Sequence, residues 1–261
     1  MFLGSNNFTF ILIAVLFLFH LIFIFYIWLM YRNIIMPTEF HNNNSNNKMQ
    51  AIEIGEKYLL QNNITALELK YNLKNYSIDK IYQNKILLIN DLSVNNVNLS
   101  LTGLGLDYVL GKVFFGSELF KKNSTIKSIR FWLFQAPKLF LFLFYFFILL
   151  NIIFVVVVNL KPSILDNEII NIINKYQLFS LFPILMGGLY LVCLAMSPKL
   201  KENLENLYES KMKKFVREEF PDFFGDWLNA RLYARSNRFT YLVGYNFIFK
   251  HNYKYTGPFG L

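Results

Sequence analysis

Three long apolar segments constrain this chain more than any motif does. They cover residues 8–30, 139–158 and 178–196, and none of them contains Asp, Glu, Lys or Arg. A helix needs roughly 20 residues to cross the hydrocarbon core of a bilayer, and only helices and closed barrels satisfy their backbone groups there. The segments predict an integral membrane protein, mainly α-helical, with three transmembrane helices.

The charges around these segments predict an orientation. Residues 1–7 carry no charged side chain, whereas 32–138 contains 13 Lys and Arg against 8 Asp and Glu. The loop 159–177 is balanced, and 197–261 again has 11 basic against 7 acidic residues. Because Lys and Arg beside a span tend to stay on the side of synthesis, we expect the N-terminus outside, and 32–138 and 197–261 inside. The first segment lacks a basic n-region and is too long for a signal peptide, so we expect a retained anchor.

The same pattern predicts four segments along the chain. They are a transmembrane helix in 1–32, a small α+β lobe in 33–130, a transmembrane hairpin in 131–197 with spans 139–158 and 178–196, and an amphipathic helix with a partner-binding tail in 198–261. Within the lobe, apolar spacing over 51–60 predicts a short helix. Alternation over 92–101 predicts one strand, with a bulge at Asn95 and Asn96.

The last quarter of the sequence contains a predicted amphipathic helix, followed by a tail rich in aromatic residues. Apolar residues at helical spacing over 199–220 predict an amphipathic helix that leaves the third span. The helix either docks on the membrane or a partner, which we favour, or is an ordinary solvated connector. Twelve aromatic residues follow over 223–259. Because a tail of this size cannot bury so many rings alone, we expect another subunit to cover it.

His20 is the only histidine within the three apolar segments. A neutral imidazole in a membrane can bind haem iron or touch a quinone, or it can form a hydrogen bond to a neighbouring helix. We predict the second role, because no other span carries a histidine. Asn151, Asn159 and Gln135 are candidate interhelical hydrogen-bond residues, and Gly187-Gly188 permits close helix packing.

Other motif-like features favour structure over chemistry. Gly103, Gly105 and Gly111-Lys112 lack the spacing of a phosphate-binding loop, and we expect them to be turn glycines. The acidic residues Glu218, Glu219, Asp222 and Asp226 lie near no histidine and are interpreted as a charge patch at a helix end. Cys193 is the only cysteine, so no disulfide within the chain can form. We predict no catalytic, cofactor-binding or metal-binding residue and no cofactor.

The arginines of the tail raise the question of RNA. Arg231, Arg235 and Arg238 interleave with aromatic residues, as on some nucleic-acid surfaces. Anionic lipid such as cardiolipin explains basic residues near a membrane more simply. We therefore expect lipid and protein partners and no nucleic acid.

The composition points to an AT-rich genome. Phe, Tyr, Met, Ile, Asn and Lys, which have AT-rich codons, make up 127 of the 261 residues. With its three spans and Asn-rich stretches such as 41–47, the chain resembles the divergent membrane proteins encoded by ciliate mitochondrial genomes. This resemblance implies a multi-pass protein of the mitochondrial inner membrane, and the charge bias then predicts its N-terminus in the intermembrane space and its C-terminus in the matrix. It rests on composition and layout and carries over no functional residue.

We therefore expect a non-catalytic structural or assembly subunit of a respiratory complex, either cytochrome c oxidase or complex I. The spans lack the buried acidic or Lys residues of a proton-pumping subunit. One alternative is a membrane anchor of succinate dehydrogenase that binds haem or quinone, although a Ser-x-x-x-Arg quinone pocket is absent. A membrane-sector subunit of ATP synthase is another. A transporter or insertase is disfavoured by the small number of spans.

Overall fold

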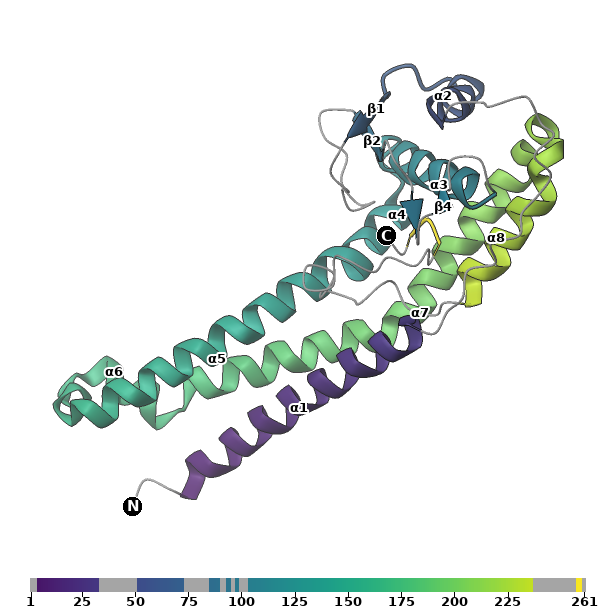
Figure 1. The fold of residues 1–261 in the computed structure, drawn as a ribbon. Helices are drawn as coiled ribbons and strands as arrows, with labels where there is room; N and C mark the ends of the chain where they lie inside the picture. Colours follow the sequence, from purple (N-terminus) through teal and green to yellow (C-terminus); the bar gives the residue numbers. More distant parts are fainter. Residues whose placement is uncertain are drawn as a thin grey trace. The chain divides into compact units, whose positions relative to one another are not determined.

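The computed structural model describes residues 4–32, 51–72, 85–89, 93–94, 97–98, 103–236 and 257–259 (Figure 1). The chain divides into two compact units. Residues 1–30 and 135–196 form the first, here called the hairpin unit, and residues 31–134 and 197–261 form the second, here called the lobe. The two units thus group the four predicted segments in pairs, the first span with the hairpin and the inner segment with the tail.

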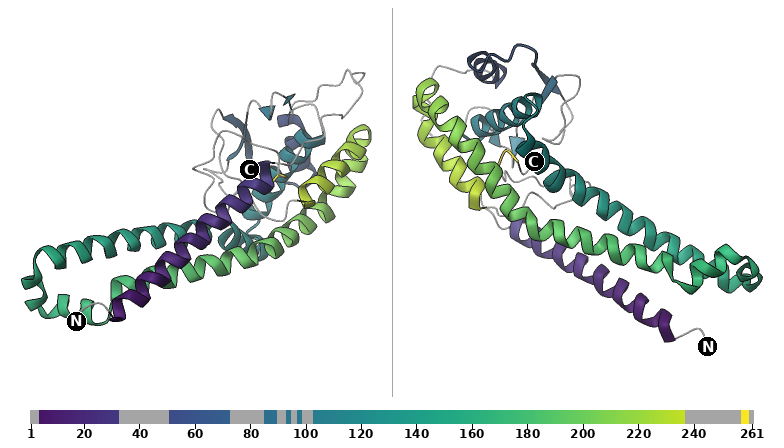
Figure 2. Two further views of the ribbon diagram at one scale, coloured as in Figure 1. Left: turned by 60° about the horizontal axis from the view of Figure 1, so that its bottom comes forward. Right: turned by 180° about the vertical axis from the view of Figure 1, so that it is seen from behind.

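The hairpin unit is built from helices. It contains α1 (Gly4–Arg32), α5 (Ala136–Leu160), η3 (Pro162–Asp166), α6 (Glu168–Lys175) and the first part of α7 (Leu178–Glu219). In both views of Figure 2, α5 and α7 form the two arms of a hairpin, with α6 at the bend. Asn167 begins α6, because its side chain accepts hydrogen bonds from the backbone of Ile169 and Ile170.

In the part of the chain that the structure describes, two helices are long and apolar enough to cross a membrane. They are Ser124–Leu160, which contains α5, and α7. The predicted segments 139–158 and 178–196 lie within them. The apolar stretch described in α1, Phe10–Tyr26, is shorter. A mainly helical chain with two helices of membrane length confirms the coarser part of the predicted fold class.

The lobe contains both helices and short strands. Its elements are α2 (Ala51–Gln61), β1 (Glu68–Asn72), β2 (Lys85–Ile89), β3 (Ser93–Val94), β4 (Val97–Asn98), α3 (Gly103–Phe120), α4 (Ser124–Ile129), η2 (Arg130–Gln135), the second part of α7, η4 (Pro221–Phe223) and α8 (Phe224–Ser236). β1 and β2 pair in parallel. The short helix predicted over 51–60 is confirmed by α2.

The prediction of a single strand over 92–101 is wrong. Ser93 and Val94 pair antiparallel with Asn98 and Val97, so the chain reverses direction between β3 and β4. The alternation that suggested one strand is shared by two short paired strands. Asn95 and Asn96, where a bulge was expected, lie outside the described residues.

The prediction of turn glycines at Gly103, Gly105 and Gly111 is also wrong. All three lie in α3, which is apolar on nearly every side and packs against α2, α8 and β2. A Cβ on Gly111 would lie 2.2 Å from Cβ of Pro258, and one on Gly103 would lie 2.4 Å from the carbonyl carbon of Asp226. These glycines therefore let other segments approach a central helix.

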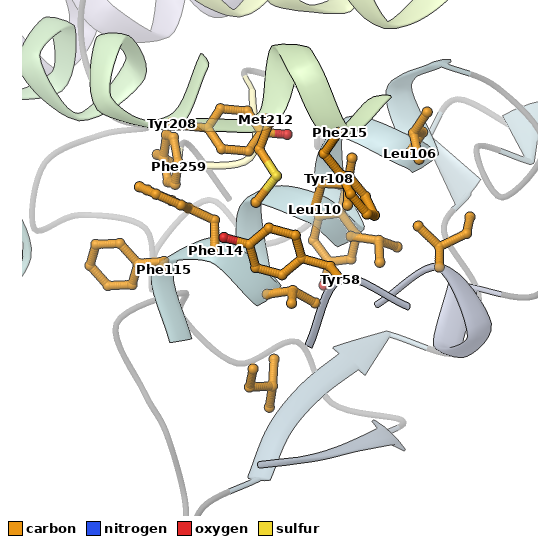
Figure 3. Packing of buried hydrophobic residues seen from close by; sticks show 14 of the residues in the cluster. Tyr58, Leu106, Tyr108, Leu110, Phe114, Phe115, Tyr208, Met212, Phe215 and Phe259 are labelled. Carbon is orange, nitrogen blue, oxygen red and sulfur yellow. The ribbon is translucent and has the colours of Figure 1, made fainter. Parts of the chain in front are cut away.

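Aromatic rings fill the core of the lobe (Figure 3). The ring centroid of Tyr208 lies 5.5 Å from that of Phe114 and 5.4 Å from that of Phe259. Trp227 is fully buried in the same cluster. For Trp227 and Phe259 the expected covering subunit is therefore not needed, because the chain's own lobe covers these rings. The tail residues 237–256 lie outside the described part of the chain.

The amphipathic part of α7 also docks within the chain. Leu204, Met212, Phe215 and Val216 are buried and belong to the core of the lobe. The apolar face that predicted docking on a membrane or a partner is occupied by α7's own lobe.

Candidate functional site: a buried ionic network

The lobe buries four charged side chains together. Asp107 comes from α3, Lys201 and Glu205 from α7, and Arg231 from α8, and none is more than 2% exposed. With Tyr208 these residues form what we call the ionic network. Lys201, Glu205 and Tyr208 share one face of α7 because they are spaced i, i+4 and i+7.

Arg231 links the two carboxylates of the network. Its Nη1 donates to Oδ1 and Oδ2 of Asp107, at 3.2 and 3.0 Å, and its Nη2 donates to Oε2 of Glu205. The guanidinium carbon lies 4.7 Å from the centroid of the Tyr208 ring. A planar guanidinium with five N–H donors suits two carboxylates and an aromatic face at once. Arg231 thus joins α3, α7 and α8.

Tyr208 extends the network toward the aromatic core. Its hydroxyl donates to Oδ1 of Asp107 at 2.9 Å and accepts from Nε1 of Trp227 at 3.4 Å. Burial, and then the charge of Asp107, raise the pKa of Tyr208 well above its ordinary value. The tyrosine therefore remains a neutral hydrogen-bond donor.

Lys201 lies at the other end of the network. Its Nζ donates to the carbonyl oxygen of Ala234 at 3.0 Å and lies 3.9 Å from Oε1 of Glu205. Burial and the neighbouring charge of Arg231 lower the pKa of Lys201 to about 7, although Asp107 acts in the opposite direction. A lysine with so low a pKa is suited to proton transfer, but a side chain that is 2% exposed cannot meet a substrate.

A second ion pair, between the buried Glu118 and the exposed Lys211, joins α3 to α7. Nζ of Lys211 donates to Oε1 of Glu118 at 2.7 Å, and Nδ2 of Asn123 donates to Oε2 of the same residue at 2.7 Å. Burial alone would raise the pKa of Glu118, but these hydrogen bonds outweigh it and the pKa is lowered. Both charged sites hold helices together, and within the described residues Oε1 of Glu205 and Nε of Arg231 have no hydrogen-bond partner.

His20 lies in a box of aromatic rings in the hairpin unit. It is fully buried, and its ring centroid is 4.6 Å from that of Phe144 and 4.9 Å from that of Tyr190, both edge to face. Within the described residues neither ring nitrogen has a hydrogen-bond partner. The expected helix neighbours are present, but the expected hydrogen bond is not. An axial haem ligand must direct a ring nitrogen at the iron, and an imidazole enclosed in this way does not fit that role.

The interhelical contacts predicted for the hairpin are found in part. Oγ of Ser180 donates to Oδ1 of Asn151 at 3.3 Å, which links α7 to α5. Gly187 lies against Phe144, since a Cβ there would be 3.0 Å from its ring. Asn159 and Gln135 are exposed.

The arginines of the tail do not form one basic surface. Arg231 is buried in the ionic network, and Arg235 contacts Glu209 and Asn206 at 2.8 Å each. Arg238 lies outside the described residues. Arg231 therefore belongs to no surface for RNA or for lipid headgroups, because its buried guanidinium is already bound by two carboxylates.

The remaining motif-like residues also have structural surroundings. Lys112 is buried, with Nζ 5.6 Å from the centroid of the Tyr108 ring. In the acidic patch, Glu219 pairs with Lys57, and Glu218 lies 3.8 Å from Lys214. Glu219 therefore ties the end of α7 to α2.

Sequence reasoning missed the ionic network. One signal was available: Asp107 is the only acidic residue between Gly103 and Ser117, in a mainly apolar stretch that also contains Lys112. A carboxylate buried in such a helix needs a positive partner. Nothing in the local sequence identifies that partner as Arg231, since α8 lies far away along the chain.

Comparison with known proteins gives no relative. No protein-family model, curated protein or solved structure matches the chain. Function therefore has to be argued from the two units themselves.

Proposed function

We propose that this chain is a non-catalytic structural subunit of a respiratory complex in the mitochondrial inner membrane, in cytochrome c oxidase or complex I. The hairpin unit anchors it in the bilayer and packs against core subunits. The lobe is a rigid body on the matrix side. Anionic lipid such as cardiolipin contacts the basic residues near the membrane.

One observation carries this proposal: large apolar side chains are exposed mainly on the hairpin unit. The exposed residues of α5 include Phe142, Leu149, Ile153 and Leu160, at 66%, 56%, 49% and 80%. A soluble protein rarely exposes so continuous an apolar surface, whereas lipid and neighbouring membrane helices favour it. The mitochondrial and respiratory parts of the proposal come from composition and layout.

The lobe supports the structural part of the proposal. Asp107, Glu205 and Arg231 pair across α3, α7 and α8, and Glu118 pairs with Lys211 across α3 and α7. Burying ion pairs costs desolvation energy and favours one arrangement of the helices over others. Such ion pairs between helices are suited to a structural role for the lobe.

Native gel electrophoresis of detergent-solubilised mitochondria tests the proposal. The chain, detected by mass spectrometry of gel slices, should comigrate with cytochrome oxidase or complex I activity. Cross-linking should then join Lys residues of the lobe to a core subunit of the same complex. Comigration with succinate dehydrogenase or ATP synthase activity would reject the assignment in favour of one of those hosts, and migration as an isolated chain would reject the role as a subunit.

A further inference from the structure

The short helix α6 turns an apolar stripe outward from the hairpin unit. Ile169, Ile172 and Tyr176 follow one another at i, i+3 and i+7, so they share a face, and they are 69%, 47% and 59% exposed. Ile173 and Asn174, by contrast, are only partly exposed and line a small pocket with residues of α1, α5 and α7. The stripe is therefore not part of the unit's own core.

The position of α6 in the chain indicates what covers this stripe. It connects α5 to α7, the two helices of membrane length, so in a bilayer-spanning hairpin it lies at the membrane boundary. The last turns of α5 also expose apolar side chains, since Val156 and Leu160 are 49% and 80% exposed. Exposed apolar side chains on both helices are expected at a lipid boundary rather than in water.

The connection between the spans carries two exposed acidic residues, Asp166 and Glu168, and two exposed basic residues that suit the phosphate of lipid headgroups. Lys161 and Lys175 are exposed near the two ends of this connection. Nζ of Lys175 lies 5.7 Å from the centroid of the Tyr176 ring, so a cation and an amphipathic ring sit together at one end of the stripe. Tyrosine and lysine side chains are favoured at the level of the headgroups.

We propose that α6 is an interfacial helix that lies in the plane of the membrane. Its Ile169, Ile172 and Tyr176 stripe inserts among phospholipid acyl chains, and Lys161 and Lys175 contact phosphate groups. Helices of this kind bury their apolar face about 5–10 Å into the boundary region. The inference rests on the membrane location in the proposed function and adds a lipid contact to the connection between the spans.

Spin labelling of the full chain in vesicles tests the inference. Cys193 is the only cysteine, so the C193A chain accepts a single nitroxide at a chosen site. Labels at Ile169 and Ile172 report the stripe, a label at Asn171 reports the exposed polar side of α6, and a label at Leu149 reports the surface of α5. The vesicles contain phosphatidylcholine and cardiolipin, and the accessibility of each label to oxygen and to a water-soluble nickel chelate is measured.

We expect a higher ratio of oxygen to chelate accessibility at Ile169 and Ile172 than at Asn171, and a still higher ratio at Leu149. Equal chelate accessibility at Ile169, Ile172 and Asn171 would overturn the inference, because α6 would then lie in water. Screening of Ile169 and Ile172 from both reagents would also overturn it, since protein would then cover the stripe. If Leu149 itself were accessible to the chelate, the membrane-spanning hairpin would fail too, which separates the two proposals.

Discussion

At the scale of single residues, Arg231 and Arg235 form a matched pair on one helix. Arg231 is buried between two carboxylates, whereas Arg235 is exposed and pairs with Glu209. Removing one partner of a buried ion pair typically costs about 3–5 kcal/mol, and an exposed pair contributes about 0–1 kcal/mol. We expect Arg231→Met to destabilise the lobe strongly and Arg235→Met to have little effect, as measured by urea denaturation in detergent. Similar losses in both variants would contradict the assigned network.

We expect the polar imidazole of His20 to lower the stability of the hairpin unit. Among the described residues its ring nitrogens have no partner, and its neighbours are the rings of Phe144 and Tyr190. An unsatisfied buried polar group costs about 1–3 kcal/mol, and a phenyl ring keeps the edge-to-face packing. We expect His20→Phe to raise the thermal stability of the chain in detergent.

The haem spectrum of the host complex should be unchanged in His20→Gln, and loss of a b-type signal would instead favour the succinate dehydrogenase anchor.

Lys201 makes the stability of the lobe depend on pH. Its pKa falls from 10.5 to about 7 on folding. Between these values the unfolded chain holds a proton that the folded chain has released, so stability rises with pH across this window and is lowest below it. The pH dependence of the urea midpoint from about pH 7 to about pH 9 should therefore be smaller in Lys201→Met than in the unmodified chain.

The control for this measurement is Lys199→Met, because Lys199 is exposed one half-turn away. It should retain the pH dependence of the unmodified chain. An unchanged pH dependence in Lys201→Met would show that Lys201 does not titrate in this range.

At the scale of elements, α3 depends on close approach at its glycines. A methyl group on Gly111 would meet Pro258, whereas one on Gly225 of α8 would meet nothing within 4 Å. Overpacking costs about 1–3 kcal/mol, and alanine favours a helix over glycine by about 1 kcal/mol. We expect Gly111→Ala to lower the urea midpoint of the lobe and Gly225→Ala to leave it unchanged or raise it. Equal effects would mean that 257–259 does not pack on α3.

At the scale of the whole molecule, the charge bias predicts which parts face the matrix. Residues 32–138 and 197–261 carry most of the Lys and Arg residues, and the structure gathers nearly all of both segments in one lobe. A single folded unit cannot be divided by a bilayer, so both segments should share one side. Protease added to mitoplasts with an intact inner membrane should spare an epitope in the lobe and cleave the chain after the inner membrane is opened. Cleavage within 197–261 in intact mitoplasts would reject this topology.

The apolar helices of the hairpin unit could be predicted from the sequence alone. A run of apolar residues as long as 139–158 or 178–196 forms a helix for a local reason, because its backbone groups must pair within the segment wherever water is absent. The helix over 51–60 and the choice of Asn151 as a candidate for an interhelical hydrogen bond follow similarly from spacing and from the cost of an unpaired buried amide. These features depend on a residue and its near neighbours in the sequence.

The lobe was decided by tertiary structure. Glycines such as Gly103 and Gly111 are frequent in turns, but both lie in α3. This helix is buried on all sides, and the missing side chains leave room for Asp226 and Pro258. Asp107 and Arg231 show no relation along the chain, yet each requires the other once both are buried. Local propensity contributes a few tenths of a kcal/mol per residue, whereas an unpaired buried charge costs several. For this reason the sequence by itself determined the apolar helices, and only long-range packing decided how the inner segment and the tail combine.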